Sequence, residues 1–182
     1  MINQFTAKTE WFLRDTSPFA IILIFVSTAL LMILYLFFVK KAKSLKSIFY
    51  AVVFSMSLTL IIMFTLLRKP GTADYGFDLA FSSLSSAFIY GSEASIVFAF
   101  NILLFIPFAF VLRMKTSAKL TAIICVVLSV CIELVQMICK LGIFEVTDIL
   151  GNCLGAMIAI LLYQLVMIVI KAVRTKKINK TS

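Results

Sequence analysis

Five long apolar runs dominate the sequence and constrain its fold more than any other feature. Each is about 20 residues long, and four of the five contain no charged residue. A helix of about 20 residues crosses about 30 Å of hydrocarbon, and continuous apolar runs indicate helices rather than the alternating strands of a membrane barrel. The sequence therefore predicts an all-α integral membrane protein with about five transmembrane helices, at residues 19–39, 47–67, 94–112, 120–139 and 149–170.

The composition leaves no room for a separate soluble domain. The 182 residues are 63% hydrophobic and 14% charged, whereas soluble proteins average roughly half and a quarter. No polar stretch is long enough to enclose its own core, so residues 1–182 are predicted to form one multi-pass domain in the cell membrane. The first apolar run is longer than the core of a signal peptide, and we expect it to be retained as a span.

The basic residues predict the orientation of the chain. The connections after the first and third runs, together with the tail, hold 12 of the 17 lysines and arginines, and the opposite connections hold five. Because basic connections stay in the cytoplasm, the N-terminus is predicted outside the cell and the C-terminus inside. The same clustering accounts for the net charge of +9, so nucleic acid is not expected as a partner.

The longest connection, residues 70–93, would then be extracytoplasmic. Phe77, Phe81, Leu84 and Phe88 recur in it at helical spacing, with serines between them. This pattern predicts a short amphipathic segment at the membrane surface. The alternative is an ordinary loop with scattered aromatic residues.

Metal and redox chemistry have no support in the sequence. The chain has no histidine, and none of its four cysteines has C-x-x-C spacing. We therefore expect neither a metal site nor a cofactor, and interpret the cysteines as small apolar residues of the spans.

Five polar side chains of the last three runs are predicted to lie at one depth in the outer leaflet. Asn101 follows the outer end of its run by about two turns, and Glu133 precedes the outer end of the next run by about 9 Å. Gln136 shares a helix face with Glu133, as Asn152 does with Asp148. Because short connections make these runs antiparallel neighbours, the sequence predicts a polar cavity open to the outer surface.

The same residues have structural interpretations. A carboxylate inside a span is costly and tends to be functional. With no basic residue at its depth, Glu133 has to be protonated, in contact with water, or hydrogen-bonded to an amide or the backbone. Asn and Gln, however, often join membrane helices as packing contacts, and Thr147 or Asp148 could serve as the N-cap of the last span.

Three further residues are assigned structural roles. Pro107 lies within the third run, where it frees the carbonyl of Leu103 and either shapes a cavity or bends the helix. Gly151 and Gly155, four residues apart, form a small-residue face for close helix contact.

Three blocks together resemble one known family. "NILLFIPFAFVL" (101–112), "SVCIELVQ" (129–136) and "DILGNCLGAMIA" (148–159) are similar to the Asn-x-x-x-Phe-x-Pro, Ile-Glu-x-x-Gln and Asp-x-x-x-Asn-x-x-Gly blocks of VanZ-like membrane proteins. The resemblance covers roughly residues 68–165, with its core at 101–155. It implies a role in resistance to glycopeptide antibiotics, chiefly teicoplanin, in Gram-positive bacteria, and it assigns no catalytic residue.

The chain also departs from this family pattern. Gly142 or Ile143 stands where an arginine is common, and Thr147 replaces one of two acidic residues. The stretch "FDLAFSS" only partly matches the Asn-Leu-x-Pro-Phe element that often precedes the third span.

Three functions fit these features. The first is a non-enzymatic envelope protein that binds or shields a lipid-anchored ligand, such as a lipoglycopeptide antibiotic or a lipid-linked cell-wall precursor, beside membrane lipid. The second is a membrane enzyme for a lipid-linked substrate, with Glu133 as general acid or base and Asp148 as its partner. The third is a small transporter, which the apolar inner half disfavours. The sequence does not specify an oligomeric state.

Overall fold

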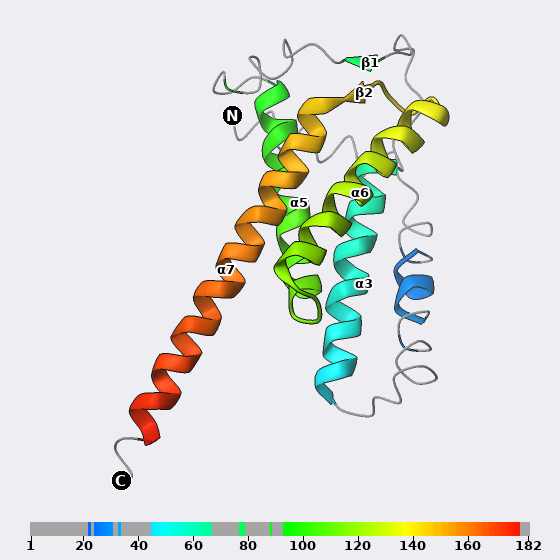
Figure 1. The fold of residues 1–182 in the computed structure, drawn as a ribbon. Coiled ribbons are helices and arrows are strands. Elements are labelled where there is room, and N and C mark those ends of the chain that lie inside the picture. Colours follow the sequence, from blue (N-terminus) through cyan, green and yellow to red (C-terminus); the bar gives the residue numbers. More distant parts are fainter. Residues whose placement is uncertain are drawn as a thin grey trace.

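The chain is helical over most of its described length. A computed structural model describes residues 22, 24–30, 33, 45–66, 77–78, 88 and 93–178. In chain order, its labelled elements are α3 (Leu45–Leu66), β1 (Phe77–Asp78), α5 (Glu93–Arg113), α6 (Ala118–Ile138), β2 (Phe144–Glu145) and α7 (Val146–Ile178). Figure 1 shows α3, α5 and α6 gathered in one bundle, with α7 packed along α5 and continuing beyond it.

Within the described residues, four helices are long and apolar enough to cross a membrane: α3, α5, α6 and α7. They overlap the second to fifth predicted spans, which fits an all-α membrane protein. The first predicted span, 19–39, lies mostly outside the described residues. Its described part, at 22, 24–30 and 33, is helical and runs beside α3, where the hydroxyls of Thr28 and Thr59 are 3.1 Å apart.

Helix α7 is longer than the sequence predicted. It runs from Val146 to Ile178, 33 residues, where a span at 149–170 was expected. At about 1.5 Å per residue it is about 50 Å long. The added turns contain no glycine or proline, and their lysines and arginine favour helix and suit its negative C-terminal end. The hydrophobic run therefore marks where α7 is apolar and not where it ends.

The two strands form a small parallel ribbon. Phe77 pairs with Phe144, and Asp78 pairs with Glu145. The predicted amphipathic helix is therefore wrong at Phe77, which is extended because its backbone pairs with a strand far along the chain. Phe81 and Leu84 of that prediction lie outside the described residues, and Phe88 is exposed in a turn.

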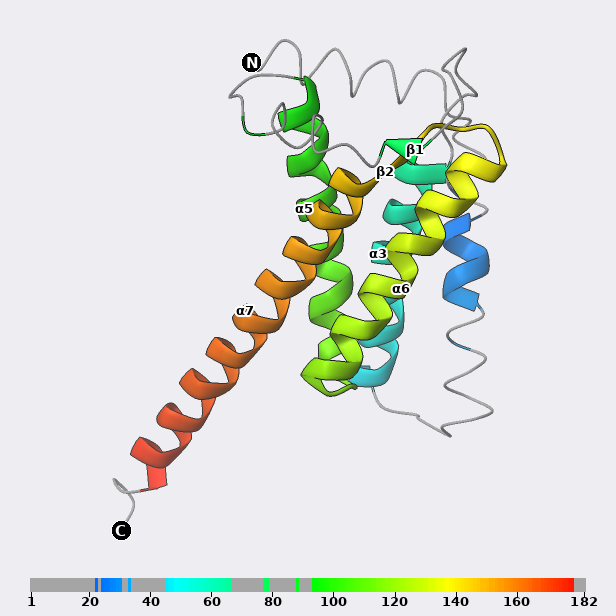
Figure 2. The ribbon, with the colours of Figure 1, turned by 45° about the horizontal axis from the view of Figure 1, so that its top comes forward.

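The termini of the helices gather at two opposite ends of the bundle. α3 and α6 finish, and α5 and α7 start, at the end that carries the ribbon, which we call the ribbon end (Figures 1 and 2). The connection between α5 and α6 and the end of α7 lie away from it, at what we call the basic end. This arrangement places the predicted outer and inner connections at opposite ends. The orientation in the membrane itself stays a prediction.

Tight turns connect α6 at both of its ends. Ser117 is its N-cap, and the Ser117 hydroxyl accepts from the N–H of Leu120 at 3.2 Å. At the ribbon end, Lys140 has a φ of 60°, and the N–H of Leu141 donates to the carbonyl of Gln136 at 2.8 Å. This pair forms a Schellman turn, which reverses the chain toward β2.

The apolar core lies below the ribbon, where α3, α5, α6 and α7 meet. Phe54 of α3 contacts Phe108 of α5, with ring centroids 5.4 Å apart. Phe105 is fully buried beside Phe108, and Ala156 and Ala159 of α7 belong to the same cluster. α5 continues without a break through Pro107 to Arg113. Pro107 therefore does not end the helix in which it lies.

Candidate functional site

Two glycines set how closely α7 approaches α5. A Cβ built on Gly155 would collide with the carbonyl oxygen of Ile102. A Cβ on Gly151 would lie 3.1 Å from the Cβ of Asn101 and 3.2 Å from the carbonyl oxygen of Phe98. The face formed by these glycines therefore lies directly against α5, and it brings Asn101 next to the start of α7.

Glu133 is buried and bonded to the backbone. Its side chain is 2% exposed, and its Oε2 accepts a hydrogen bond from the N–H of Glu145 at 3.0 Å. The sequence left three possibilities for this carboxyl group: protonation, contact with water, or a hydrogen bond to an amide or the backbone. The structure shows the hydrogen bond to the backbone. The bond joins α6 to β2, the strand that leads into α7.

Asn152 connects α7 to the same face of α6. Its Nδ2 donates to the hydroxyl of Ser129 at 2.8 Å, and Ser129 lies one turn before Glu133 on α6. Both partners are buried. Sequence reasoning did not single out Ser129, although its place four residues before Glu133, inside the second quoted block, is the signal that could have found it.

Gln136 has a partner outside the last three helices. Its Nε2 donates to the carbonyl of Thr65, in the last turn of α3, at 2.8 Å. The last carbonyls of a helix lack partners within that helix, so Gln136 satisfies one of them. This contact matches the structural interpretation of Gln136, and it adds α3 to the walls of the site.

Asp148 and Thr147 lie in the first turn of α7. Both side chains are buried. The helix begins at Val146, so neither residue is its N-cap, contrary to that alternative. A carboxylate in the first turn still interacts favourably with the positive end of the helix.

Asn101 and Asn152 each keep one buried polar atom without a described partner. Nδ2 of Asn101 and Oδ1 of Asn152 are enclosed, and neither has a hydrogen bond within the described part of the chain. Nearly all buried polar groups in proteins are paired, and an unpaired one costs about 1–3 kcal/mol. The buried site therefore holds one free donor on Asn101, which lies against Gly151, and one free acceptor on Asn152, the residue that follows Gly151.

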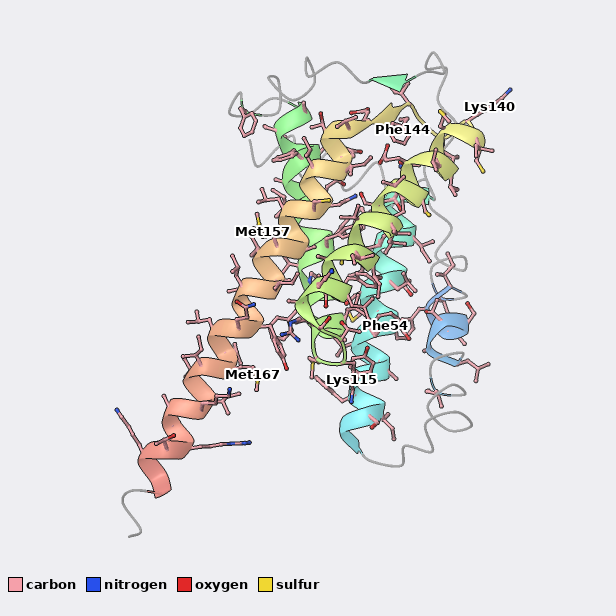
Figure 3. All side chains as sticks on the ribbon, viewed as in Figure 1. Phe54, Lys115, Lys140, Phe144, Met157 and Met167 are labelled. Atoms are coloured by element: carbon pink, nitrogen blue, oxygen red, sulfur yellow. The ribbon has the colours of Figure 1, made fainter. Side chains whose placement is uncertain are left out.

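The five predicted residues are thus gathered near the ribbon end, and each is less than a tenth exposed. Figure 3 shows Phe144 of the ribbon at this end, with Lys140 close by at the turn that follows α6. The side chains form a covered polar cluster, held by Ser129, the carbonyl of Thr65 and the backbone of Glu145. That the cluster opens to the outer surface stays a prediction.

A comparison with protein families finds a match over more than half of the chain. A family model described as VanZ/LLP1 matches residues 56–168. The matched region includes α5, α6, most of α7 and all five residues of the polar cluster. No curated protein and no solved structure matches the chain.

Proposed function

The chain belongs to the VanZ/LLP1 family, and on this premise we propose that it is a cell-membrane protein of the bacterial envelope that confers resistance to glycopeptide antibiotics of the teicoplanin type. In this proposal the polar cluster binds or shields a lipid-anchored ligand and catalyses no reaction. The family assignment agrees with the resemblance found in the three sequence blocks. The choice of ligand rests on the residues of the cluster.

The free atoms of Asn101 and Asn152 are the observation that carries the proposal. One is a donor and the other an acceptor, and both are buried. Asn101 lies beside Gly151 at the α5–α7 contact, and the side chain of Asn152 reaches α6 through Ser129. A peptide amide or a sugar hydroxyl offers the matching acceptor and donor together. Glycopeptides and cell-wall precursors contain many such groups, so their polar parts suit this pair.

The place of the cluster along the helices suits a ligand with a lipid anchor. All five residues lie within segments apolar enough to cross a membrane, or at the ends of those segments. With the predicted orientation they face the outer leaflet, where an acyl chain holds its polar group at the same level. A ligand free in water would instead have to enter the apolar part of the bundle.

The ribbon is the element that has to move for binding. It is attached to the cluster through the N–H of Glu145 and the carboxyl group of Glu133, and it has only two residue pairs of its own. So short a ladder contributes little stability. In this proposal an arriving polar group replaces the Glu145–Glu133 hydrogen bond and opens access to Asn101 and Asn152.

The test is a susceptibility panel in a teicoplanin-sensitive host. We expect the wild-type chain to raise the inhibitory concentration of teicoplanin more than that of vancomycin. Asn101→Leu and Asn152→Leu should each remove most of this increase, and Gln164→Leu, on an exposed part of α7, should retain it. No increase with well-expressed wild-type chain would defeat the proposal.

Mass spectrometry of the lipid-linked precursors separates binding from catalysis. If the chain only binds or shields its ligand, the precursors keep their masses when it is expressed. A new precursor mass that disappears with Glu133→Gln would favour the enzyme, with Glu133 as general acid or base.

A further inference from the structure

The basic end carries three cations close together, and the carboxylates of α5, α6 and α7 lie toward the opposite end of those helices. Arg113, Lys115 and Lys119 fall within seven residues at the connection between α5 and α6. The nearest acidic residues along the chain are Glu93 and Glu133, which lie toward the opposite, ribbon end. Figure 3 shows Lys115 at the basic end, far from Lys140 and Phe144. Within the described residues these cations therefore have no anionic partner.

Aromatic rings from two other helices hold two of the cations. The guanidinium carbon of Arg113 is 4.8 Å from the ring centroid of Tyr163 on α7, and Nζ of Lys115 is 5.4 Å from that of Tyr50 on α3. Nη1 of Arg113 also donates to the carbonyl of Thr116 at 2.6 Å. Ring contacts at these distances are attractive, so they favour positions of Arg113 and Lys115 close to α7 and α3, while Lys115 stays exposed.

Donors remain available in this arrangement. Nε of Arg113 is buried and has no hydrogen-bond partner among the described residues. A lysine ammonium has three donors, and an aromatic face engages its charge without supplying an acceptor atom. The connection therefore presents the exposed ammonium groups of Lys115 and Lys119 with unused hydrogen-bonding capacity, whereas Nε of Arg113 is enclosed.

The start of α6 adds to the positive potential. Ser117 caps this helix, and the positive end of the helix dipole faces the same connection. Lys119 lies in the first turn, where a cation is unfavourable. A bound anion would reduce the repulsion between Lys119 and the positive end of α6. A further cation or a neutral group would not reduce it.

The surroundings identify the anion as part of a lipid. Met114, Leu120 and Ile123 are between 46% and 49% exposed next to the cations, so an apolar surface adjoins the charged one. Segments of 20 and 21 residues lead up to and away from this connection, which places it at the level of the headgroups. A phosphate attached to acyl chains matches both surfaces.

We propose that Arg113, Lys115 and Lys119 form a binding site, the basic clamp, for the phosphate of an anionic phospholipid headgroup. The site is separate from the polar cluster at the ribbon end and does not depend on the function proposed for that cluster. The bound phosphate connects the turn between α5 and α6 to α3 and α7, whose Tyr50 and Tyr163 already contact Lys115 and Arg113.

The experiment uses the full-length chain in detergent, with lipids retained after washing measured by native mass spectrometry. Phosphatidylglycerol, phosphatidylcholine and inorganic phosphate are added in separate samples. The clamp variant is Lys115→Gln with Lys119→Gln, and the control is Lys171→Gln with Lys176→Gln on the exposed end of α7. Both doubles remove two surface lysines, so they differ only in where charge is lost.

We expect the wild-type chain to retain phosphatidylglycerol in preference to phosphatidylcholine. The clamp variant should bind it about tenfold more weakly, and the control should change by less than about threefold. An equal loss in both doubles would mean diffuse attraction and would overturn the site. Binding of inorganic phosphate as strong as that of the lipid would also overturn it, because the acyl chains would then contribute nothing.

Discussion

The carboxyl group of Glu133 accepts a hydrogen bond from the backbone N–H of Glu145 at 3.0 Å, twelve residues further along the chain. A buried acidic side chain inside a segment apolar enough to cross a membrane thus holds the strand that leads into α7. This bond links the polar cluster to β2, so we expect a change at Glu133 to affect the stability of the ribbon end.

Replacing Glu133 tests this coupling. Glu133→Ala removes the carboxylate that accepts from the N–H of Glu145, and we expect a loss of about 1–3 kcal/mol in the free energy of unfolding. Glu133→Gln keeps an acceptor oxygen and should lose less than half as much. Thermal unfolding of the purified chain in detergent measures both, with Leu134→Ala as an exposed neighbouring control. Equal losses for the Ala and Gln variants would contradict the bond.

Adding one methyl group at Gly155 should disrupt the α5–α7 contact. A Cβ there meets the carbonyl of Ile102, which is backbone and cannot rotate away. Gly155→Ala is expected to cost about 1–3 kcal/mol, as overpacking usually does. Gly142→Ala is the matched control, because nothing lies within 4 Å of the Cβ it would add. Similar melting temperatures for the two variants would argue against the close approach.

The Asn152–Ser129 bond can be measured by a double-mutant cycle. Ser129→Ala and Asn152→Leu each remove one partner of a buried side-chain pair 2.8 Å apart. We expect a coupling energy of about 0.6–2 kcal/mol, the range found for polar contacts between membrane helices. Denaturant unfolding of the four proteins gives this value. A coupling energy near zero would mean that the two side chains do not stabilise each other.

A glycine at Lys140 should stabilise the protein. Lys140 has a φ of 60°, a left-handed conformation that costs residues with a Cβ about 1–2 kcal/mol and glycine almost nothing. After the extra chain entropy of glycine is subtracted, Lys140→Gly should gain about 0.5–1 kcal/mol. Cys139→Gly is the control, since φ there is −81° and the change should bring no gain. A lower melting temperature for Lys140→Gly would refute this expectation.

The native cysteine after α6 tests the predicted orientation. Cys139 is exposed at the ribbon end, so a membrane-impermeant thiol reagent should label it in intact cells if that end faces outward. Cys139→Ser should abolish this labelling. In the Cys139→Ser background, Lys171→Cys, on the far part of α7, should react only after the cells are opened. The reverse pattern would place the N-terminus inside.

Several features were predictable from the sequence because they depend on distance along one helix. The lengths of the apolar runs located α3, α5, α6 and much of α7. The rise per residue predicts that Asn101, Glu133 and Asn152 lie at one depth, and all three are buried. The three sequence blocks identified the family, and the match over residues 56–168 confirms it.

Other features depend on how the helices rotate and cross, and only the tertiary structure decided them. Strands of two residues carry no periodic signal, so the pairing of Phe77 with Phe144 could not be predicted. The partner of Gln136 is a carbonyl of α3, 71 residues away. Because any unpaired carbonyl can accept from an amide, the sequence did not indicate which one would do so. The sequence by itself determined which side chains share a depth, because that follows from the rise of a single helix. Which of them touch was decided by the approach of α7 to α5 at Gly155, since that contact fixes the rotation and spacing of the helices.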